Sequence, residues 1–225
     1  MKKLLLMLVL YFFTVQISFG QKKTSISGII ENARDTTTNI ELVIFDGQFA
    51  KTEVQNIQLV TNNGKFKFDF ELKRRARAGI TINNRLVFLP GSFDVMVNPG
   101  DNFTITIPDV NKLGLGNITF NGKGVEKLNL LKAINQKRLA TGIHRLSWDR
   151  TSITDKYVNA DIYLNIIDSM CRVSKLKDPL DLQFIKAQQF DGSMDLILDH
   201  SVRNYSDSVA ILFEKYIKKN GSLLF

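Results

Sequence analysis

The most chemically mixed residues of this 225-residue chain lie close together, just after its midpoint. They are His144, Ser147, Trp148 and Asp149, with Arg145 and Arg150 beside them. An aspartate near a histidine can orient a general base. However, Ser147 lacks the glycine-flanked turn that exposes a nucleophilic serine. We therefore expect a loop that Trp148 anchors to the rest of the protein, rather than a catalytic group.

A second candidate is a set of carboxylates spaced four residues apart, namely Asp191, Asp195 and Asp199. This spacing would place them on one face of a helix. Calcium requires six or more oxygen ligands, usually from a loop, whereas Arg203 offers Asp199 a simple ion-pair partner. The pair Asp199-His200 is a weaker catalytic candidate than the first cluster. We expect a structural role here and no metal site.

Cys171 is the single cysteine, so an intramolecular disulfide and a two-cysteine redox motif are excluded. Its helical context predicts a buried, unreactive thiol. The alternative is an exposed thiol that forms a mixed disulfide or a covalent dimer in an oxidising compartment. With two histidines in the chain, a histidine-rich metal site is also disfavoured. We predict no catalytic, cofactor-binding or metal-binding residues, and no thiol–disulfide exchange or peroxidase turnover.

The first 20 residues have the pattern of a secretory signal peptide. Lys2 and Lys3 precede an apolar run over residues 4–13, and Ser18 and Gly20 stand where a signal peptidase requires small residues. The run is too short to span a membrane, and no cysteine follows it for lipid attachment. The sequence predicts a mature chain that starts at Gln21 and is exported to the periplasm or beyond, soluble and not a lipoprotein.

The mature chain would be basic, because removal of the two leading lysines leaves 28 basic against 22 acidic side chains, a net charge of +6. Its densest basic run is Lys73, Arg74, Arg75 and Arg77. No aromatic residue interrupts this run to stack on bases, and export makes nucleic acid an improbable partner. We interpret the run as a solvated turn between strands. The alternative is a contact with anionic envelope material or an acidic partner.

Residues 21–122 show the pattern of an antiparallel β-sandwich. In residues 65–71 polar and apolar side chains alternate, which predicts that Phe66, Phe68 and Phe70 point inward. Asn62-Asn63-Gly64 before them would close a hairpin with residues 56–60. The other predicted strands cover residues 26–30, 41–45, 79–82, 93–97, 103–107 and 117–120. We expect the turn at residues 98–101 to lead the chain from one strand into the next.

Residues 123–225 change to a helical period, so the expected fold class is α+β: a sandwich followed by a helical unit. Three apolar stripes at helical spacing support this, and another helix is expected to begin at Pro179. The stripes are Val125, Leu128, Leu131 and Ile134; Val158, Ile162, Ile166, Met170 and Val173; and Val209, Leu212, Phe213, Tyr216 and Ile217. The last has Ser206 and Asp207 at its start and Gly221 as its stop.

Residues 86–91 (LVFLPG), 93–105 (FDVMVNPGDNFTI) and 118–124 (ITFNGKG), with the helix that follows, resemble a known extracytoplasmic domain. This domain of unknown function precedes thioredoxin-like (TlpA-like or AhpC/TSA) domains in envelope disulfide reductases. The helix around Phe184-Ile185-Lys186 is similar to the spacer that separates the two. The thioredoxin-like domain needs about another hundred residues and a pair of thiols, and neither is present within the 225 residues.

The sequence therefore leaves two functions open. The first is a non-catalytic envelope module that scaffolds or binds a protein partner, such as a thioredoxin-like or redox protein. The alternative is a stand-alone sandwich that binds a ligand or glycan. Exposed aromatic side chains on one strand face would favour the glycan-binding protein. Inward-facing aromatics would favour the module.

Overall fold

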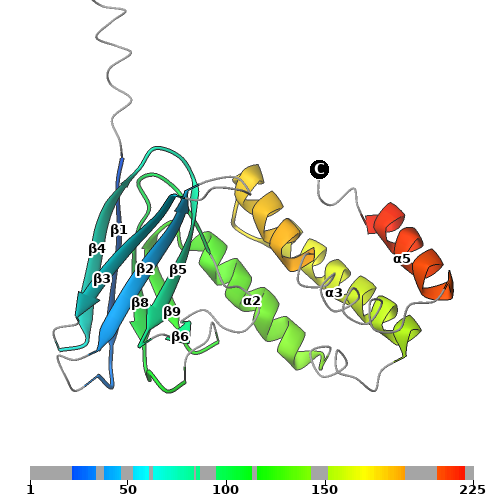
Figure 1. Cartoon of the computed structure of the whole chain (residues 1–225), viewed down its shortest axis with the longest axis horizontal. Helices are drawn as coiled ribbons and strands as arrows, with labels where there is room; N and C mark the ends of the chain where they lie inside the picture. The colour runs from blue at the N-terminus through cyan, green and yellow to red at the C-terminus, as the bar shows by residue number, and fades with distance from the viewer. Residues whose placement is uncertain are drawn as a thin grey trace, which may run out of the picture.

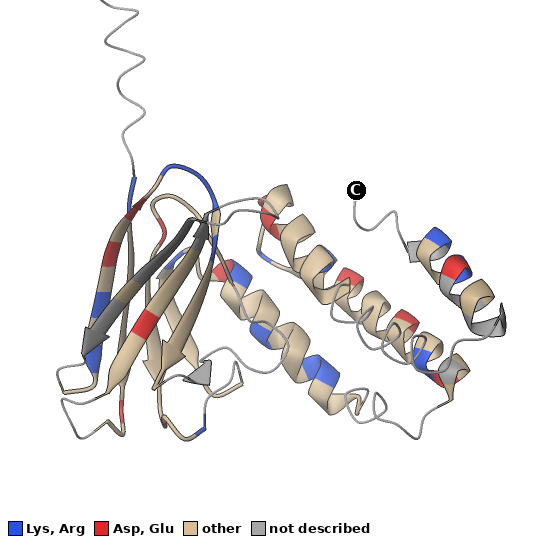
Figure 2. Cartoon of the chain, in the orientation of Figure 1, with Lys and Arg blue, Asp and Glu red and all other residues tan. Residues whose placement is uncertain are grey.

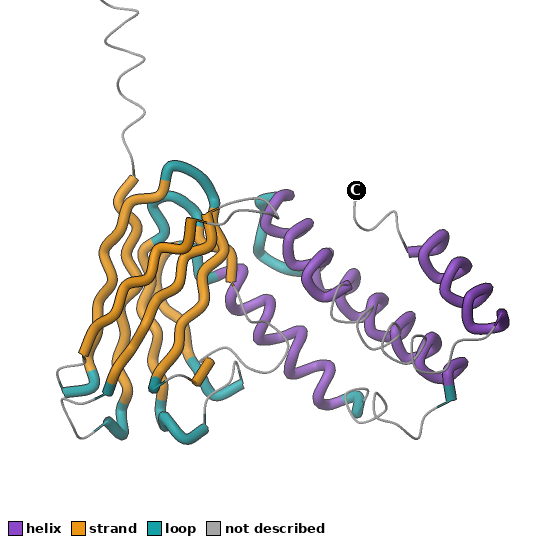
Figure 3. Tube along the Cα trace, in the orientation of Figure 1, coloured by secondary structure: helices purple, strands orange, loops and turns teal. Residues whose placement is uncertain are grey.

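The computed structural model describes residues 22–33, 38–46, 53–60, 63–83, 85–86, 95–112, 116–142, 152–190 and 207–220. The predicted signal peptide lies outside these ranges. Two packed β-sheets are followed by helices, as the α+β prediction required (Figures 1 and 3). Within the described ranges, no helix is both long and apolar enough to cross a membrane.

The nine described strands form two sheets with a shared apolar core. The first sheet has the order β4 (Lys65–Leu72), β1 (Lys22–Ile30), β8 (Asn102–Ile107) and β9 (Thr119–Lys123). The second has the order β3 (Glu53–Val60), β2 (Asn39–Asp46), β5 (Ala76–Ile82) and β6 (Arg85–Leu86), with β7 (Val95–Val97) also paired to β5. Phe66, Phe68 and Phe70 are buried between the sheets, as their alternation predicted.

The predicted hairpin between residues 56–60 and 65–71 is wrong, although both strands exist. β3 pairs with β2, and β4 pairs with β1 in the other sheet. Asn63 and Gly64 adopt the expected positive φ, but the Gly64 carbonyl accepts a hydrogen bond from the amide of Ile30, at 2.8 Å. The turn therefore packs on the end of β1 and passes the chain between sheets. An alternating strand buries its apolar face whether it pairs with β3 or with β1. The local pattern of β4 therefore does not predict its partner.

Phe66 and Gly28 fit each other closely where β4 pairs with β1. The two residues are opposite each other in the ladder, and a β-carbon on Gly28 would lie 2.2 Å from Cζ of the Phe66 ring. The ring occupies the space that glycine leaves open. This complementarity joins residues that are far apart in the sequence and is therefore invisible to turn chemistry.

One strand pair departs from the expected antiparallel arrangement, because β1 and β8 run parallel. All other pairs in both sheets are antiparallel. Parallel neighbours require a long crossover connection, and here strands β2 to β7 provide it. The turn at residues 98–101 ends this crossover, because β7 belongs to the second sheet and β8 to the first.

The helical unit contains α2 (Glu126–Ala140), α3 (Ile153–Val173), α5 (Asp207–Asn220) and a helix over residues 179–190. α2 lies beside the sandwich, with α3 and then α5 farther away (Figure 1). The predicted stripe of α2 is confirmed, since Leu128, Leu131 and Ile134 are at most 3% exposed. Pro179 is the first residue of its helix, as predicted. The α5 prediction is confirmed in its bounds, and Tyr216 is buried.

The apolar stripe predicted for α3 is not the face that the core buries. Val158, Ile162 and Val173 are 51%, 44% and 80% exposed, whereas Ile166 and Met170 of the same stripe are half-buried and Met170 packs against the core. The buried face carries a second set of apolar residues, Tyr157, Ala160, Tyr163, Leu164, Ile167 and Cys171. α3 is therefore apolar on two faces. Periodicity identified one of them but did not determine which face meets the core.

Candidate functional site

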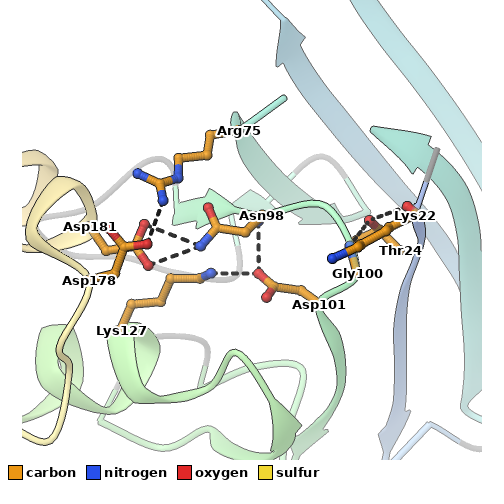
Figure 4. A network of polar contacts seen from close by, with 9 residues as sticks. All are labelled: Lys22, Thr24, Arg75, Asn98, Gly100, Asp101, Lys127, Asp178 and Asp181. Atoms are coloured by element: carbon orange, nitrogen blue, oxygen red, sulfur yellow. Dashed lines mark hydrogen bonds and ion pairs between the residues drawn. The ribbon is translucent and has the colours of Figure 1, made fainter. Parts of the chain in front are cut away.

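The turn at residues 98–101 and the start of α2, which follows the ITFNGKG segment (residues 118–124), meet at a buried ion pair. Asp101, after the Pro99-Gly100 turn, and Lys127, in the first turn of α2, are 5% and 2% exposed. Lys127 Nζ donates to Asp101 Oδ2 at 2.5 Å, and the backbone amide of Asn98 donates to the same oxygen at 2.8 Å (Figure 4). The ion pair thus connects the first sheet of the sandwich to α2.

Gly124, the last glycine of the ITFNGKG segment, makes this ion pair possible. Its φ is +91°, a conformation that side chains with a β-carbon rarely adopt. A β-carbon at this position would lie 2.3 Å from Asp101 Oδ1. The glycine therefore leaves room for the carboxylate just before α2 begins, so that Lys127 can reach it.

The same turn also holds the start of the helix over residues 179–190. Asn98 Nδ2 donates to both carboxylate oxygens of Asp181, at 3.0 and 3.3 Å, and Arg75 donates to Asp178 (Figure 4). Asp178 Oδ1 also accepts the backbone amide of Leu180 at 3.0 Å, which caps the helix. We call Arg75, Asn98, Asp101, Lys127, Asp178 and Asp181 the polar joint.

Sequence reasoning missed most of the polar joint. It placed Arg75 in a solvated basic turn, whereas the side chain is part-buried against Asp178. Lys127 and Asp181 were not singled out, because charged residues in the first turn of an amphipathic helix are expected on its exposed side. The groups of the joint bind one another, so its clearest role is to orient the helices on the sandwich.

The exposed apolar face of α3 borders a shallow, open groove, which we call the α3 groove. It has a volume of about 310 Å³ and is lined by Lys137, Ile162, Asn165, Ile166, Ser169 and Met170. Lys137 is the single charged residue of this lining. Small-molecule sites are usually enclosed and bury most of their ligand. An open groove of this size is better suited to side chains that a partner protein inserts.

An aromatic cluster supports α3 from the opposite side. The rings of Tyr157 and Tyr216 lie 5.3 Å apart in an edge arrangement, and Phe190 stacks on Tyr216 at 6.3 Å. The Tyr163 hydroxyl also hydrogen-bonds with Gln189. Helix 179–190 and α5 therefore both pack on α3, which fixes the orientation of the face that borders the groove.

Cys171 is buried, as expected, with 5% of its surface exposed. Burial raises the pKa of its thiol, and the nearby Asp168 carboxylate raises it further, although Lys186 opposes this change. The reactive thiolate is therefore disfavoured at neutral pH. This environment supports the interpretation of Cys171 as a packing residue of the α3 core.

The other sequence candidates lie outside the described residues. These are the cluster over residues 144–150 and the acidic set with Asp191, Asp195, Asp199, His200 and Arg203. In the ranges that the structure describes, no group of three or more histidine, cysteine, aspartate or glutamate side chains could hold a metal ion.

The geometry defines a class of protein: an α+β chain in which a two-sheet sandwich carries a helical unit through a buried polar joint. Comparison with models of protein families, with curated proteins and with solved structures gave no match. The resemblance to the region that precedes thioredoxin-like domains therefore stays a prediction, based on its short motifs.

Proposed function

We propose that this protein is a non-catalytic, exported envelope module that binds a partner protein through its helical unit. The observation that carries the proposal is the second apolar face of α3. A helix at the surface of a globular protein needs one apolar face to pack on the core. α3 has a complete buried face and a further exposed apolar face, of which Val158 and Ile162 are part. Exposed apolar patches of this kind are typical of interaction sites.

The distribution of exposed apolar side chains over the described structure supports the same proposal. Among the side chains whose burial the structure describes, the large apolar ones that are exposed lie on the helical unit. They are Leu139, Val158, Ile162, Val173, Leu180, Ile211 and Ile217. These side chains give the helical unit an apolar surface that is available for binding.

The polar joint supports a scaffolding role for the sandwich. Binding costs less free energy when the interacting surface is held in one orientation beforehand. The joint fixes the starts of two helices on a single turn of the sandwich, at residues 98–101. The sandwich then serves as a base that presents the helical unit, and the thioredoxin-like or redox protein named by the resemblance is the first partner to test.

The alternative function, glycan binding on a sheet face, receives no support from the strand rings whose burial the structure describes. Glycan sites of this kind need exposed aromatic rings, but Phe66, Phe68, Phe70, Phe103 and Phe120 are at most 7% exposed. These rings build the core of the sandwich.

Site-specific photo-crosslinking in cells tests the proposal. A photoreactive amino acid at Ile162 is expected to give one discrete adduct with an envelope protein, and the same group at Lys65 on β4 is expected to give none. An untagged wild-type chain should compete for the adduct, whereas an Ile162→Glu chain should not. Equal labelling from both positions would contradict the proposal.

N-terminal sequencing of the exported chain tests the proposed export separately. The sequence is expected to begin at Gln21.

A further inference from the structure

One end of the sandwich gathers basic side chains from segments that are distant in the sequence. Lys22 begins β1 and lies opposite Leu72, the last residue of β4, so that Lys73 and Arg74 follow at the same end. Figure 2 shows this concentration of basic residues where β1 begins and β4 passes to β5. The basic run found in the sequence is therefore one part of a larger surface.

Two further segments complete this surface. Lys22 and Lys123 flank Gly100, where a β-carbon would lie 3.3 Å from Lys22 Cδ and 3.8 Å from Lys123 Nζ. The bond between Arg75 and Asp178 brings the end of the 174–178 connection to the same place, and with it Lys175 and Lys177. We call Lys22, Lys73, Arg74, Lys123, Lys175 and Lys177 the basic end; all six are exposed.

The carboxylates near the basic end are fewer than its six cations. Asp101 and Asp178 pair with Lys127 and Arg75 within the polar joint, whereas Asp181 binds the amide of Asn98, which carries no charge to neutralise it. The exposed carboxylates of this end, in the part of the chain that the structure describes, are Glu71 and Glu126. Lys73 follows β4, Lys22 begins β1 and Lys123 ends β9. These cations therefore span the four strands of one sheet, a width of about 14 Å. Cations this close together create a positive field that one anionic surface can meet at several points.

The position of the basic end in the chain identifies the surface that it would meet. Lys22 directly follows the predicted mature start at Gln21, so the predicted signal peptide is joined to the chain at this end. While a signal peptide is in the membrane, the end of the domain that follows it faces the lipid headgroups. Clusters of four to eight lysines and arginines next to a membrane are attracted to anionic lipids.

We infer that the basic end binds the anionic phospholipid surface of the membrane across which the chain is exported. The inference rests on the proposed export. It gives the module an orientation: the basic end of the sandwich faces the lipid, while the exposed face of α3 is left for the partner protein.

Sedimentation of the purified chain with vesicles tests this inference without any partner or export step. Residues 21–225 are expected to bind vesicles that contain phosphatidylglycerol and not vesicles of phosphatidylcholine alone, and added salt should release the protein. The double variant Lys22→Glu with Lys73→Glu is expected to bind at least about tenfold more weakly. Soluble glycerol phosphate should not compete, because a surface engages many headgroups at once.

The matched control is the double variant Lys215→Glu with Lys218→Glu on α5, which changes the net charge by the same amount at exposed positions far along the chain. It should bind as the wild type does, and circular dichroism should show that both variants are folded. Equal loss in the two variants would mean attraction by net charge alone and would overturn the inference. Failure to bind anionic vesicles would also overturn the inference, as would equally tight binding of soluble glycerol phosphate. Neither result affects the crosslinking test at Ile162, so the two proposals fail independently.

Discussion

The sandwich and the helical unit treat apolar side chains in opposite ways. In β4 every second residue is apolar, and Phe66, Phe68, Phe70 and Leu72 are at most 7% exposed. In α3 the apolar residues occupy two faces, and Val158 and Ile162 of the second face are about half exposed. A strand with period two has one face for the opposing sheet and one for solvent, so β4 buries its apolar face within the sandwich. α3 has more apolar faces than the described helices and sheets cover.

The largest difference between the two regions should appear when a large apolar side chain is removed from each. Phe68→Ala empties a site that is 1% exposed and is expected to lower the free energy of unfolding by about 3–5 kcal/mol. Ile162→Ala removes a side chain that is 44% exposed and should change it by less than about 0.5 kcal/mol. Denaturant unfolding of both variants measures this. Similar losses would show that Ile162 belongs to the stable core.

A somewhat smaller effect is expected where the two regions are joined. Lys127→Met removes the cation from a pair that is almost fully buried and leaves Asp101 with the Asn98 amide alone. Breaking a buried ion pair on one side is costly, so the free energy of unfolding should fall by about 3 kcal/mol. The control Lys218→Met breaks an exposed pair with Glu214 and should cost under about 0.5 kcal/mol. A Lys127 variant as stable as this control would show that the joint does not stabilise the fold.

The smallest effect concerns the acid dependence of the helical unit. The hydrogen bond from Lys186 lowers the pKa of Asp168, burial opposes this, and the charges of Lys186 and Arg172 lower it further. A lowered pKa in the folded state stabilises the fold above the ordinary value of 3.8, and this contribution is lost as the pH falls through the lowered value. Because the pair is partly exposed to solvent, Asp168→Asn should cost at most about 1 kcal/mol at neutral pH.

Unfolding curves of the wild type and of Asp168→Asn, measured across the acid range, test this expectation. The difference between them should shrink below pH 3.8 and vanish at lower pH. A constant difference would mean that the substitution acts through packing rather than through the charge of Asp168.

Local chemistry predicted the strands followed by the helices, with the exception of the two-residue strand β6 (Arg85–Leu86). The alternation in residues 65–71 predicted an inward face with Phe66, Phe68 and Phe70, and the structure confirms it. Positive φ at Asn63 and Gly64 and the helix start at Pro179 were also correct. These properties depend on steric limits of single residues and on the period of one segment, which are present in the sequence itself. The burial of Cys171 followed from its residue type, since a free cysteine packs like a small apolar side chain.

Only the tertiary structure decided which segments meet. A turn with positive φ can close a hairpin or cross between sheets, and the fit of Phe66 over Gly28 accompanies the pairing of β4 with β1. α3 could bury either of its apolar faces, and the packing of Tyr157 against Tyr216 accompanies the burial of the face that the stripe did not indicate. Asp101 and Lys127 are 26 positions apart, and neither residue type predicts burial. Each outcome depends on contact free energies between distant residues, which the pattern of a single segment does not contain.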